Sequence, residues 1–427
     1  MPLRTLYLCY FGLREPLVQT QVLPYLRQLG ADGDMEVFLL TFETKVYSPA
    51  EKLEWRQLLA NQGIRWFSLP YHKSPSVLVT PYDVMRGALT AARLARRYQI
   101  DVLHARGHMP MAMALLAKRW CNVRLVFDIR GLLAEEYEEA GVWKKNSPQF
   151  RAVQAIERAG LRHSDQIIVL TRRFRDLLVE RRQATADQIE VIPCCVDFER
   201  FQHYENNGQP SSNESRRDAQ DPAMNPKPIK RFEVISAGSV TGLYLLEDMG
   251  RFFLALKKQR LDAFFRILTM SSATEASATL KRIGLDQKDF LISAVKPSEV
   301  PSYLRRARLG LSFRKATYSQ IAASPTKIAE YLAAGLPVVC NAGIGDTEEL
   351  LASRQVGVIL REFDEKSLAT AASDAVALAE DPHVKARCVE TAYQYFDLAS
   401  VGGAGYRNVY RRFAEDQAGA LARPTAT

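Results

Sequence analysis

The 427-residue sequence lacks the features that mark several classes of protein. It contains no apolar run approaching the ~18–20 residues that a membrane-spanning helix needs. The first apolar run, Leu6–Leu13, is too short for a signal peptide and has no small-residue cleavage site. The six cysteines are scattered and form no Cys-x-x-Cys pair, which favours reduced thiols over a disulfide framework. We therefore expect a soluble protein of the cytoplasm.

The excess of positive charge is spread along the chain and is not gathered in one basic tail. Lys and Arg number 57 against 48 Asp and Glu, a net charge of +9. Local enrichments at Arg86–Arg97, Arg172–Arg182 and Arg407–Arg412 fall in helix-like patterns, so solvated basic helix faces are the simplest interpretation. Attraction to an anionic membrane surface is the alternative. Nucleic acid is not expected as a partner, because no basic motif is interleaved with aromatic residues.

The sequence does have a sustained alternation of strand-like and helix-like segments. Short apolar runs such as Thr5–Phe11 and Val123–Asp128 are separated by longer segments with helical periodicity, such as Glu15–Gly30 and Pro81–Tyr98. Further strands are expected at Glu36–Thr41, Arg65–Leu69, Val102–Ala105, Gln166–Leu170, Phe232–Ala237, Phe264–Thr269, Phe290–Ala294, Leu309–Phe313, Pro337–Cys340 and Gly357–Leu360. This pattern predicts parallel sheets covered by helices on both faces.

The alternation stops near Phe201 and restarts at Phe232. The residues between them are rich in Asn, Ser and Pro and nearly devoid of apolar residues, which is typical of a flexible linker. We predict an N-terminal Rossmann-like domain over 1–202, a linker or insertion over 203–231, a second Rossmann-like domain over 232–390 and a C-terminal helical segment over 391–427. Ligands of doubly wound domains bind at the carboxyl ends of the strands.

The most informative segment contains an abrupt helix start. Ser324 is a good N-cap, Pro325 suits the first helical position, and Gly335 suits the helix end. Such a start presents free N–H groups and the positive end of the helix dipole, which together can hold a phosphate group. We expect Ser324, Pro325 and Thr326 to form this phosphate cradle.

Two charged residues follow in the same helix. Lys327 falls in the first turn, where a cation opposes the helix dipole unless an anion is bound there. Glu330 lies three residues further on and could accept hydrogen bonds from two ribose hydroxyls. A plain i,i+3 ion pair on a surface helix would explain both residues equally well.

The stretch Ala322–Val339 resembles the nucleotide-sugar signature of GT-B glycosyltransferases, specifically the large retaining family 4. In that family, a Glu on this helix binds the donor ribose and the helix N-terminus holds the pyrophosphate. Other stretches resemble the family in the same order: Tyr10–Gly12, His104–His108, Phe127–Gly131, Val191–Asp197, Ser236–Ser239 and Tyr395–Tyr410. The resemblance implies two Rossmann-like domains facing across a cleft, a C-terminal helix that crosses back to the first domain, retention of anomeric configuration and no need for a metal.

The sequence departs from the family pattern at two places. Many members have two Glu residues eight apart on this segment, whereas the first of these positions is Ala322 here. The basic residues that clamp the phosphates after the first strand of the second domain are missing between Gly238 and Leu246. We assign their role to Arg314, Lys315 or Lys327.

Residue pattern and resemblance together define a candidate site with a donor side and an acceptor side. The donor side comprises Gly12, Gly238, Ser239, Arg314, Lys315, Ser324, Pro325, Thr326, Lys327 and Glu330. The acceptor side comprises Asp128 and Arg130. The catalytic candidates are His104, Arg106 and His108, and either histidine could be the sugar-contacting His of the family. No metal ion or other cofactor is expected.

We predict a hexosyltransferase-type glycosyltransferase that moves a sugar from a UDP- or GDP-sugar to a hydroxyl of a glycan or lipid-linked glycan. It would serve exopolysaccharide, lipopolysaccharide or other glycoconjugate synthesis, in the cytoplasm or on the inner face of the cell membrane. Two alternatives stay open. Ala322 and the missing phosphate clamp would also suit a catalytically inert GT-B-like binding protein, and a sugar-nucleotide epimerase would form its product without an acceptor.

Overall fold

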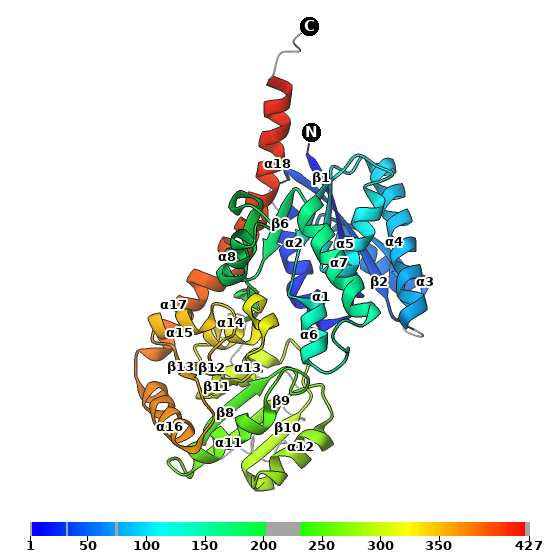
Figure 1. Cartoon of the computed structure of the whole chain (residues 1–427). Coiled ribbons are helices and arrows are strands. Elements are labelled where there is room, and N and C mark those ends of the chain that lie inside the picture. The colour runs from blue at the N-terminus through cyan, green and yellow to red at the C-terminus, as the bar shows by residue number, and fades with distance from the viewer. Residues whose placement is uncertain (1, 31–32, 73–75, 202–230, 423–427) are drawn as a thin grey trace. The chain divides into compact units, whose positions relative to one another are not determined.

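The computed structural model describes residues 2–30, 33–72, 76–201 and 231–422 (Figure 1). The predicted linker over 203–231 lies outside these residues, apart from Arg231. The chain forms two compact units, each built from more than one stretch of the sequence. The first unit comprises Met1–Cys195, Tyr318–Ser324 and Leu398–Thr427, and the second comprises Val196–Thr317 and Pro325–Asp397.

In its described residues, the first unit holds a parallel sheet of seven strands in the order β3-β2-β1-β4-β5-β6-β7. The strands are β1 (Leu3–Cys9), β2 (Met35–Glu43), β3 (Ile64–Pro70), β4 (Val102–Arg106), β5 (Arg124–Asp128), β6 (Gln166–Val169) and β7 (Ile189–Val191). The helices are α1 (Pro16–Gln21), α2 (Leu23–Gly30), α3 (Pro49–Ala60), α4 (Ser76–Tyr98), α5 (His108–Ala117), α6 (Leu133–Glu139), α7 (Pro148–His163), α8 (Arg172–Glu180) and α18 (Ala404–Ala422).

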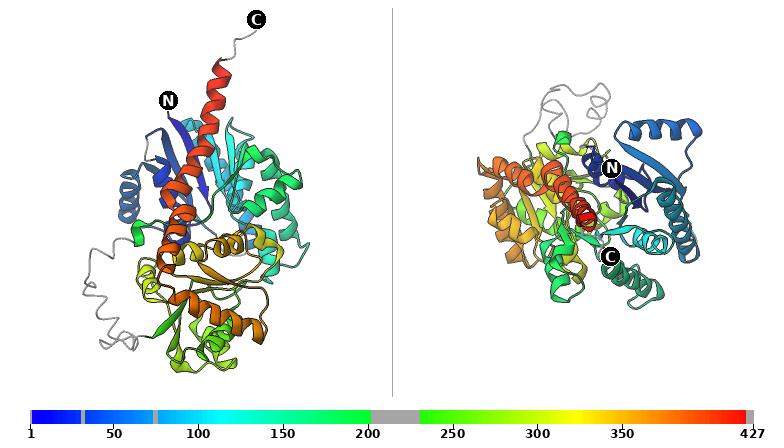
Figure 2. Two further views of the ribbon diagram at one scale, coloured as in Figure 1. Left: turned by 90° about the vertical axis from the view of Figure 1, so that its left-hand side faces the viewer. Right: turned by 90° about the horizontal axis from the view of Figure 1, so that it is seen from above.

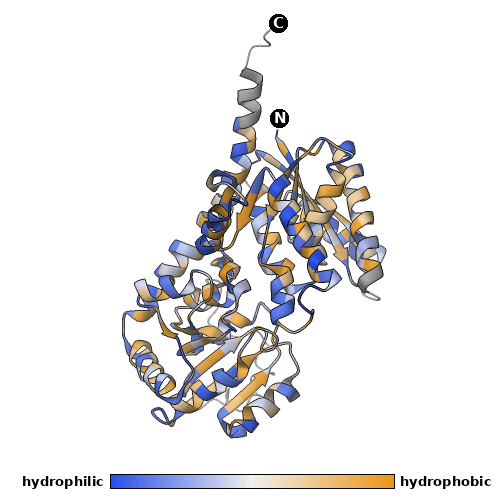
Figure 3. Ribbon diagram, in the orientation of Figure 1, coloured by the Kyte–Doolittle hydropathy of each residue, from blue (hydrophilic) through white to orange (hydrophobic). Residues whose placement is uncertain are grey.

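Alternating side chains of β1 pack on the two opposite faces of this sheet. Leu6 and Leu8 belong to one apolar cluster, whereas Tyr7 and Cys9 belong to the other. Successive side chains of a strand point to opposite faces, so a strand covered on both sides is apolar throughout. In Figure 3, the strands are accordingly mostly orange, and the helices carry mixed colours. This confirms the parallel, doubly covered sheet that the sequence predicts.

The C-terminal helix α18 packs on the second of these clusters. Its Tyr406, Val409, Tyr410 and Phe413 are buried there, and Figure 2 shows the red helix lying along the blue strands of the first unit. The return of the C-terminal helix to the first unit is therefore confirmed. A short π-helix, Leu398–Gly403, precedes it.

The second unit, in its described residues, holds a parallel sheet of six strands in the order β10-β9-β8-β11-β12-β13. The strands are β8 (Phe232–Ala237), β9 (Ala263–Leu268), β10 (Phe290–Ser293), β11 (Leu309–Ser312), β12 (Val338–Asn341) and β13 (Gly357–Leu360). The helices are α11 (Leu246–Lys257), α12 (Ala273–Arg282), α13 (Val300–Arg306), α14 (Thr326–Ala333), α15 (Thr347–Ser353), α16 (Glu365–Glu380) and α17 (Val384–Phe396). An apolar cluster again covers each face.

Two expected helices are divided in the structure. The helix expected from Glu15 to Gly30 breaks at Val22, whose φ of −122° is not helical. Pro24 follows in the first turn of α2, where its missing N–H costs least. The C-terminal helical segment expected over 391–427 is divided between α17 and α18, because the chain passes from the second unit to the first after Asp397.

No helix in the described part of the chain is long and apolar enough to cross a membrane.

Candidate functional site

Both sheets reverse their strand order at one point, between β1 and β4 in the first unit and between β8 and β11 in the second. Loops that leave the sheet in opposite directions at such a point open a crevice at the carboxyl ends of the strands, where ligands of this architecture bind. In the second unit, Gly238 follows β8 and Arg314 lies just after β11. The predicted donor residues therefore flank this reversal point.

Helix α14 starts one residue later than the sequence predicts. Its N-cap is Pro325, which offers no side-chain hydrogen bond, and Thr326 is the first helical residue. The predicted N-cap, Ser324, is wrong: its hydroxyl accepts a hydrogen bond of 3.2 Å from the N–H of Cys194. The first N–H groups of α14 thus have no side-chain cap. The helix ends as expected, because Gly335 adopts a left-handed φ of +75° just after it.

Lys327 is the most unusual side chain of the second unit. Only 6% of its surface is exposed, and its Nζ has no hydrogen-bond partner among the described residues. The ammonium lies 4.0 Å from the centre of the Tyr244 ring, and a Cβ placed on Gly238 would come within 3.8 Å of Nζ. Burial, with Arg314 nearby, lowers the pKa of Lys327 to about 7, although Glu330 acts in the opposite direction. A buried amine without a partner is expensive unless a ligand supplies one.

Arg314 provides a second cation beside Lys327. Its guanidinium donates to the Tyr244 hydroxyl at 3.2 Å and lies over the same ring, while its Nε has no hydrogen-bond partner within the described residues. Asn341, at the end of β12, accepts the Arg314 N–H and donates to the Arg314 carbonyl. The neighbouring strand therefore fixes this loop, which places two positive charges against the ring of Tyr244.

Glu330 lies one turn further along α14. Its Oε1 is 3.4 Å from Arg200, which also donates to the carbonyl of Pro297. Burial raises the pKa of Glu330, while Arg200 opposes that shift. Arg200 thus orients a half-buried carboxylate, and the simple surface pair of Lys327 with Glu330 is not what the structure shows.

The other donor candidates differ in their surroundings. Gly238 has a left-handed φ of +105° and is exposed, as is Ser239. Lys315 is half-buried, and its backbone N–H donates to the carbonyl of Leu243. Gly12 lies in the first unit, where a Cβ would come 2.5 Å from the Glu43 carboxylate. Close packing against Glu43 explains this glycine without a ligand.

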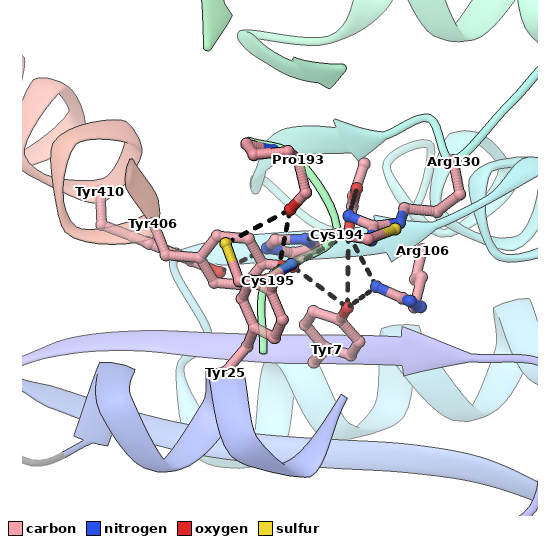
Figure 4. A network of polar contacts seen from close by, with 11 residues as sticks. Tyr7, Tyr25, Arg106, Arg130, Pro193, Cys194, Cys195, Tyr406 and Tyr410 are labelled. Carbon is pink, nitrogen blue, oxygen red and sulfur yellow. Dashed lines mark hydrogen bonds and ion pairs between the residues drawn. The ribbon is translucent and has the colours of Figure 1, made fainter. Parts of the chain in front are cut away.

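In the first unit, the catalytic and acceptor-side candidates other than His108 meet in one buried network (Figure 4). Asp128 ends β5 and is fully buried. Its Oδ2 accepts from Tyr406 at 2.9 Å and from Arg106 at 3.3 Å, and its Oδ1 accepts from Arg130 at 3.2 Å. Although burial alone would raise the pKa of Asp128, the charges of Arg130 and Arg106 hold it below its usual range. This carboxylate is ionised.

The two histidine candidates do not lie together. His104 is fully buried, and its Nδ1 is 2.8 Å from the Tyr410 hydroxyl, while its Nε2 is 3.6 Å from Asp128, too long for a hydrogen bond. Burial lowers the pKa of His104, so its ring is neutral. His108 begins α5 and is also buried, with its Nε2 3.0 Å from Glu157. The structure therefore ties His104 to α18 and His108 to α7.

Several residues of these sites escaped the sequence analysis. Tyr244 and Arg200 complete the surroundings of Lys327 and Glu330, and Tyr7 and Tyr406 complete those of Asp128. Each is distant in sequence from the residue that it contacts. The aromatic residues of the C-terminal segment were the one available signal, because they recur at helical spacing.

Comparisons with known proteins bear on both units. Residues 18–195 match the family model described as the glycosyl transferase 4-like domain. A glycosyltransferase from Rickettsia africae is 14% identical, covers 96% of this chain and 98% of its own, and gives a TM-score of 0.67. A sucrose-phosphate synthase from Thermosynechococcus elongatus is 15% identical, with 97% and 100% covered and a TM-score of 0.67. Anabaena HepE in complex with UDP and glucose is 15% identical, with 97% and 99% covered and a TM-score of 0.63.

At these identities the likeness to solved structures shows the fold, and it confirms the predicted GT-B architecture of two Rossmann-like units. The match over residues 18–195 adds a family likeness for much of the first unit. No curated protein matches this chain in sequence.

Proposed function

We propose that this protein is a glycosyltransferase that moves a hexosyl group from a UDP- or GDP-sugar to a hydroxyl of an acceptor, with retention of configuration and without a metal. One observation carries the proposal: the buried ammonium of Lys327, which has no hydrogen-bond partner among the described residues, lies beside Arg314 at the strand-order reversal of the second unit. The family likeness of residues 18–195 supports the same activity independently.

The chemistry of sugar transfer explains why this unit would hold such cations. Breaking the bond between the anomeric carbon and the donor phosphate leaves a nucleoside diphosphate, whose charge grows toward the transition state. Lys327, Arg314 and the uncapped N-terminus of α14 would stabilise that charge. Glu330, oriented by Arg200, would accept the ribose hydroxyls. In this scheme the protein's own cations do the work that a divalent metal does elsewhere.

The acceptor in this proposal is a glycan or a lipid-linked glycan. Helix α4 supports a lipid-linked acceptor, because it exposes Tyr82, Met85 and Leu89 at helical spacing where the basic stretch Arg86–Arg97 begins. An exposed apolar stripe flanked by arginines suits peripheral binding to an anionic leaflet, where each Arg contributes roughly 1 kcal/mol. Sedimentation with anionic vesicles tests this part: we expect binding that salt weakens, and no binding at low salt contradicts it.

The primary experiment is calorimetric titration of UDP, GDP and the free nucleosides. We expect Lys327→Ala to weaken diphosphate binding by about 2 kcal/mol while leaving nucleoside binding nearly unchanged, because its partner is charge. Lys258→Ala removes an exposed lysine of the same unit and is the matched control. Equal losses for diphosphate and nucleoside would contradict the assignment of Lys327.

Incubation with nucleotide sugars then separates the candidate activities. Transfer requires an acceptor, so sugar–acceptor product supports the proposal, and retained anomeric configuration in that product supports its stereochemical part. A new nucleotide sugar formed without any acceptor would instead identify an epimerase. Nucleotide binding without turnover of any donor would leave a catalytically inert binding protein.

A further inference from the structure

The polar network of the first unit has more positive than negative charge. Arg106 and Arg130 both pair with the one carboxylate of Asp128, at 3.3 Å and 3.2 Å. Within the described residues, neither arginine makes an ion pair with a second carboxylate. Burial keeps the His104 ring neutral, and burial also raises the pKa of Tyr406 well above its usual value, so neither side chain changes the sum. The network therefore carries a surplus of one positive charge.

A buried surplus charge is costly, and the fold does not need it. Asp128 would keep an arginine partner and its bonds from Tyr7 and Tyr406 if Arg130 were neutral. Burial and the charge of Arg130 both act to lower the pKa of Arg106, although Tyr7, Asp128 and Tyr406 outweigh them and raise it above its usual value. Residues that reduce stability without structural benefit tend to belong to functional sites.

The position of the surplus charge is that of a ligand site. Arg106 is the last residue of β4, next to β1 at the strand-order reversal, and Arg130 follows the end of β5 by two residues. The Arg130 side chain retains 16% of its exposure, against 4% for Arg106. Apart from Asp128, the one partner of its guanidinium in the described structure is the Cys194 sulfur at 3.5 Å, a weak acceptor. Figure 4 shows both arginines on the same side of the network, away from α18.

We propose that the first unit binds a phosphate group of the acceptor through Arg130, with Arg106 behind it. A phosphate ester offers two to three strong acceptor oxygens and about −1.5 to −2 charge, which more than balances the surplus and suits the planar fork of a guanidinium. Calling this ligand the acceptor rests on the proposed function, whereas binding of a phosphate group does not. The phosphate could belong to a soluble sugar phosphate or to a lipid carrier.

The test uses two probes and two variants. Glycerol 3-phosphate is titrated into the full chain with UDP present, and UDP is titrated separately. We expect Arg130→Gln to weaken glycerol 3-phosphate binding by about tenfold or more while UDP binding is unchanged, and Lys327→Ala to do the reverse. Arg56→Gln, which changes an exposed arginine of the same unit outside the basic stretch Arg86–Arg97, is the matched control. Unchanged glycerol 3-phosphate binding in Arg130→Gln would overturn the inference.

The two proposals fail separately in this design. Arg130-dependent binding of glycerol 3-phosphate without any UDP binding would sustain the phosphate site and contradict the transferase. If the protein binds UDP but shows no Arg130-dependent binding of either glycerol 3-phosphate or a lipid phosphate, the nucleotide site is sustained and the phosphate site is contradicted. Vesicles of phosphatidylcholine with and without phosphatidic acid distinguish the sources, since Arg130-dependent binding confined to the vesicles indicates a lipid phosphate. Glucuronate bound as tightly as glycerol 3-phosphate would overturn the choice of phosphate over carboxylate.

Thermal unfolding gives a readout that a purely structural arginine would not produce. Without phosphate, we expect the Tm of Arg130→Gln to equal or exceed that of the parent, because the substitution removes the surplus charge and leaves Asp128 paired with Arg106. With glycerol 3-phosphate, the parent Tm should rise and the variant Tm should not. A Tm well below that of the parent without phosphate would show that Arg130 serves the fold, against the inference.

Discussion

The two strand-order reversals share a topology but differ in the charged side chains that lie at them. In the first unit, Asp128 offsets part of the charge of two arginines, and tyrosines from β1 and α18 complete its hydrogen bonds. In the second unit, Lys327 lies beside Arg314 on one tyrosine ring, and no hydrogen-bond partner of its Nζ lies in the described parts of the chain. We therefore expect the first network to stabilise the fold and the second cluster to bind a ligand.

This difference predicts which property each substitution changes. Removing a group from the Asp128 network should mainly lower the free energy of unfolding, because its members satisfy one another. Removing Lys327 or Glu330 should mainly lower nucleotide affinity. Arg130 is the exception in the first unit, because its charge exceeds what Asp128 balances.

The largest effect is expected from Asp128→Asn. The variant leaves two buried guanidiniums without a carboxylate and should lose about 3–5 kcal/mol of unfolding free energy in urea titrations. Because the folded-state pKa of Asp128 is depressed, its contribution is present above its unfolded pKa near 4 and is lost as the pH falls below that value. The variant should lack this acid-dependent loss. A change below about 1 kcal/mol would mean that the network does not support the fold.

The second prediction concerns Lys327→Met and pH. The folded-state pKa of Lys327 is lowered to about 7, so the unfolded chain binds more protons between about pH 7 and 10.5, and the parent gains stability as the pH rises through that window. The variant should be more stable than the empty parent, most of all below about pH 7. For the parent, UDP binding at about pH 8 should take up close to one proton, measured by calorimetry in buffers of different ionisation enthalpy.

Arg314, Glu330 and Arg200 also face this region, so Arg314→Gln is the companion variant. It should weaken UDP binding but keep the proton uptake. Proton uptake that persists in Lys327→Met would assign the titration to another group.

The third prediction tests the ribose contact of Glu330. Glu330→Gln should weaken UDP binding by about tenfold, the value of one charge-assisted hydrogen bond. In the parent, 2′-deoxy-UDP should bind more weakly than UDP, whereas in the variant the two ligands should bind alike. Additive losses in this cycle would place the carboxylate away from the ribose.

The sequence predicts much of the fold because each strand carries its own signal. Runs such as Phe232–Ala237 coincide with β8 to the residue, since a doubly covered strand is apolar along its whole length. Helix boundaries are less predictable, because the break at Val22 depends on local backbone geometry and on Pro24. The assignment of Tyr318–Ser324 and of the C-terminal stretch to the first unit depends on tertiary packing, which no local sequence pattern encodes.

The site is predictable only where its residues are neighbours in sequence. Lys327 and Glu330 share one helix with a strong start signal. The structure places Lys327 beside Gly238 and Glu330 beside Arg200. The surroundings of His104 could not be predicted, because its partner Tyr410 lies 306 positions away and reaches it only through the return of α18. The family resemblance supplies candidates such as His104, but it does not reveal that this ring is fully buried.

The finest division within the first network is expected from Tyr406→Phe and Tyr410→Phe. Tyr406 donates to the ionised Asp128 at 2.9 Å, whereas Tyr410 bonds to His104 at 2.8 Å and to Thr5 at 2.9 Å, both neutral. Hydrogen bonds to charged groups contribute about 1.5–3 kcal/mol and neutral ones about 1 kcal/mol, so Tyr406→Phe should cost more unfolding free energy in urea than Tyr410→Phe. Both variants should bind UDP like the parent, because neither side chain belongs to the second unit. A larger loss of unfolding free energy for Tyr410→Phe than for Tyr406→Phe would contradict the assignment of the charged hydrogen bond to Tyr406. Weakened UDP binding in either variant would contradict the placement of nucleotide binding in the second unit.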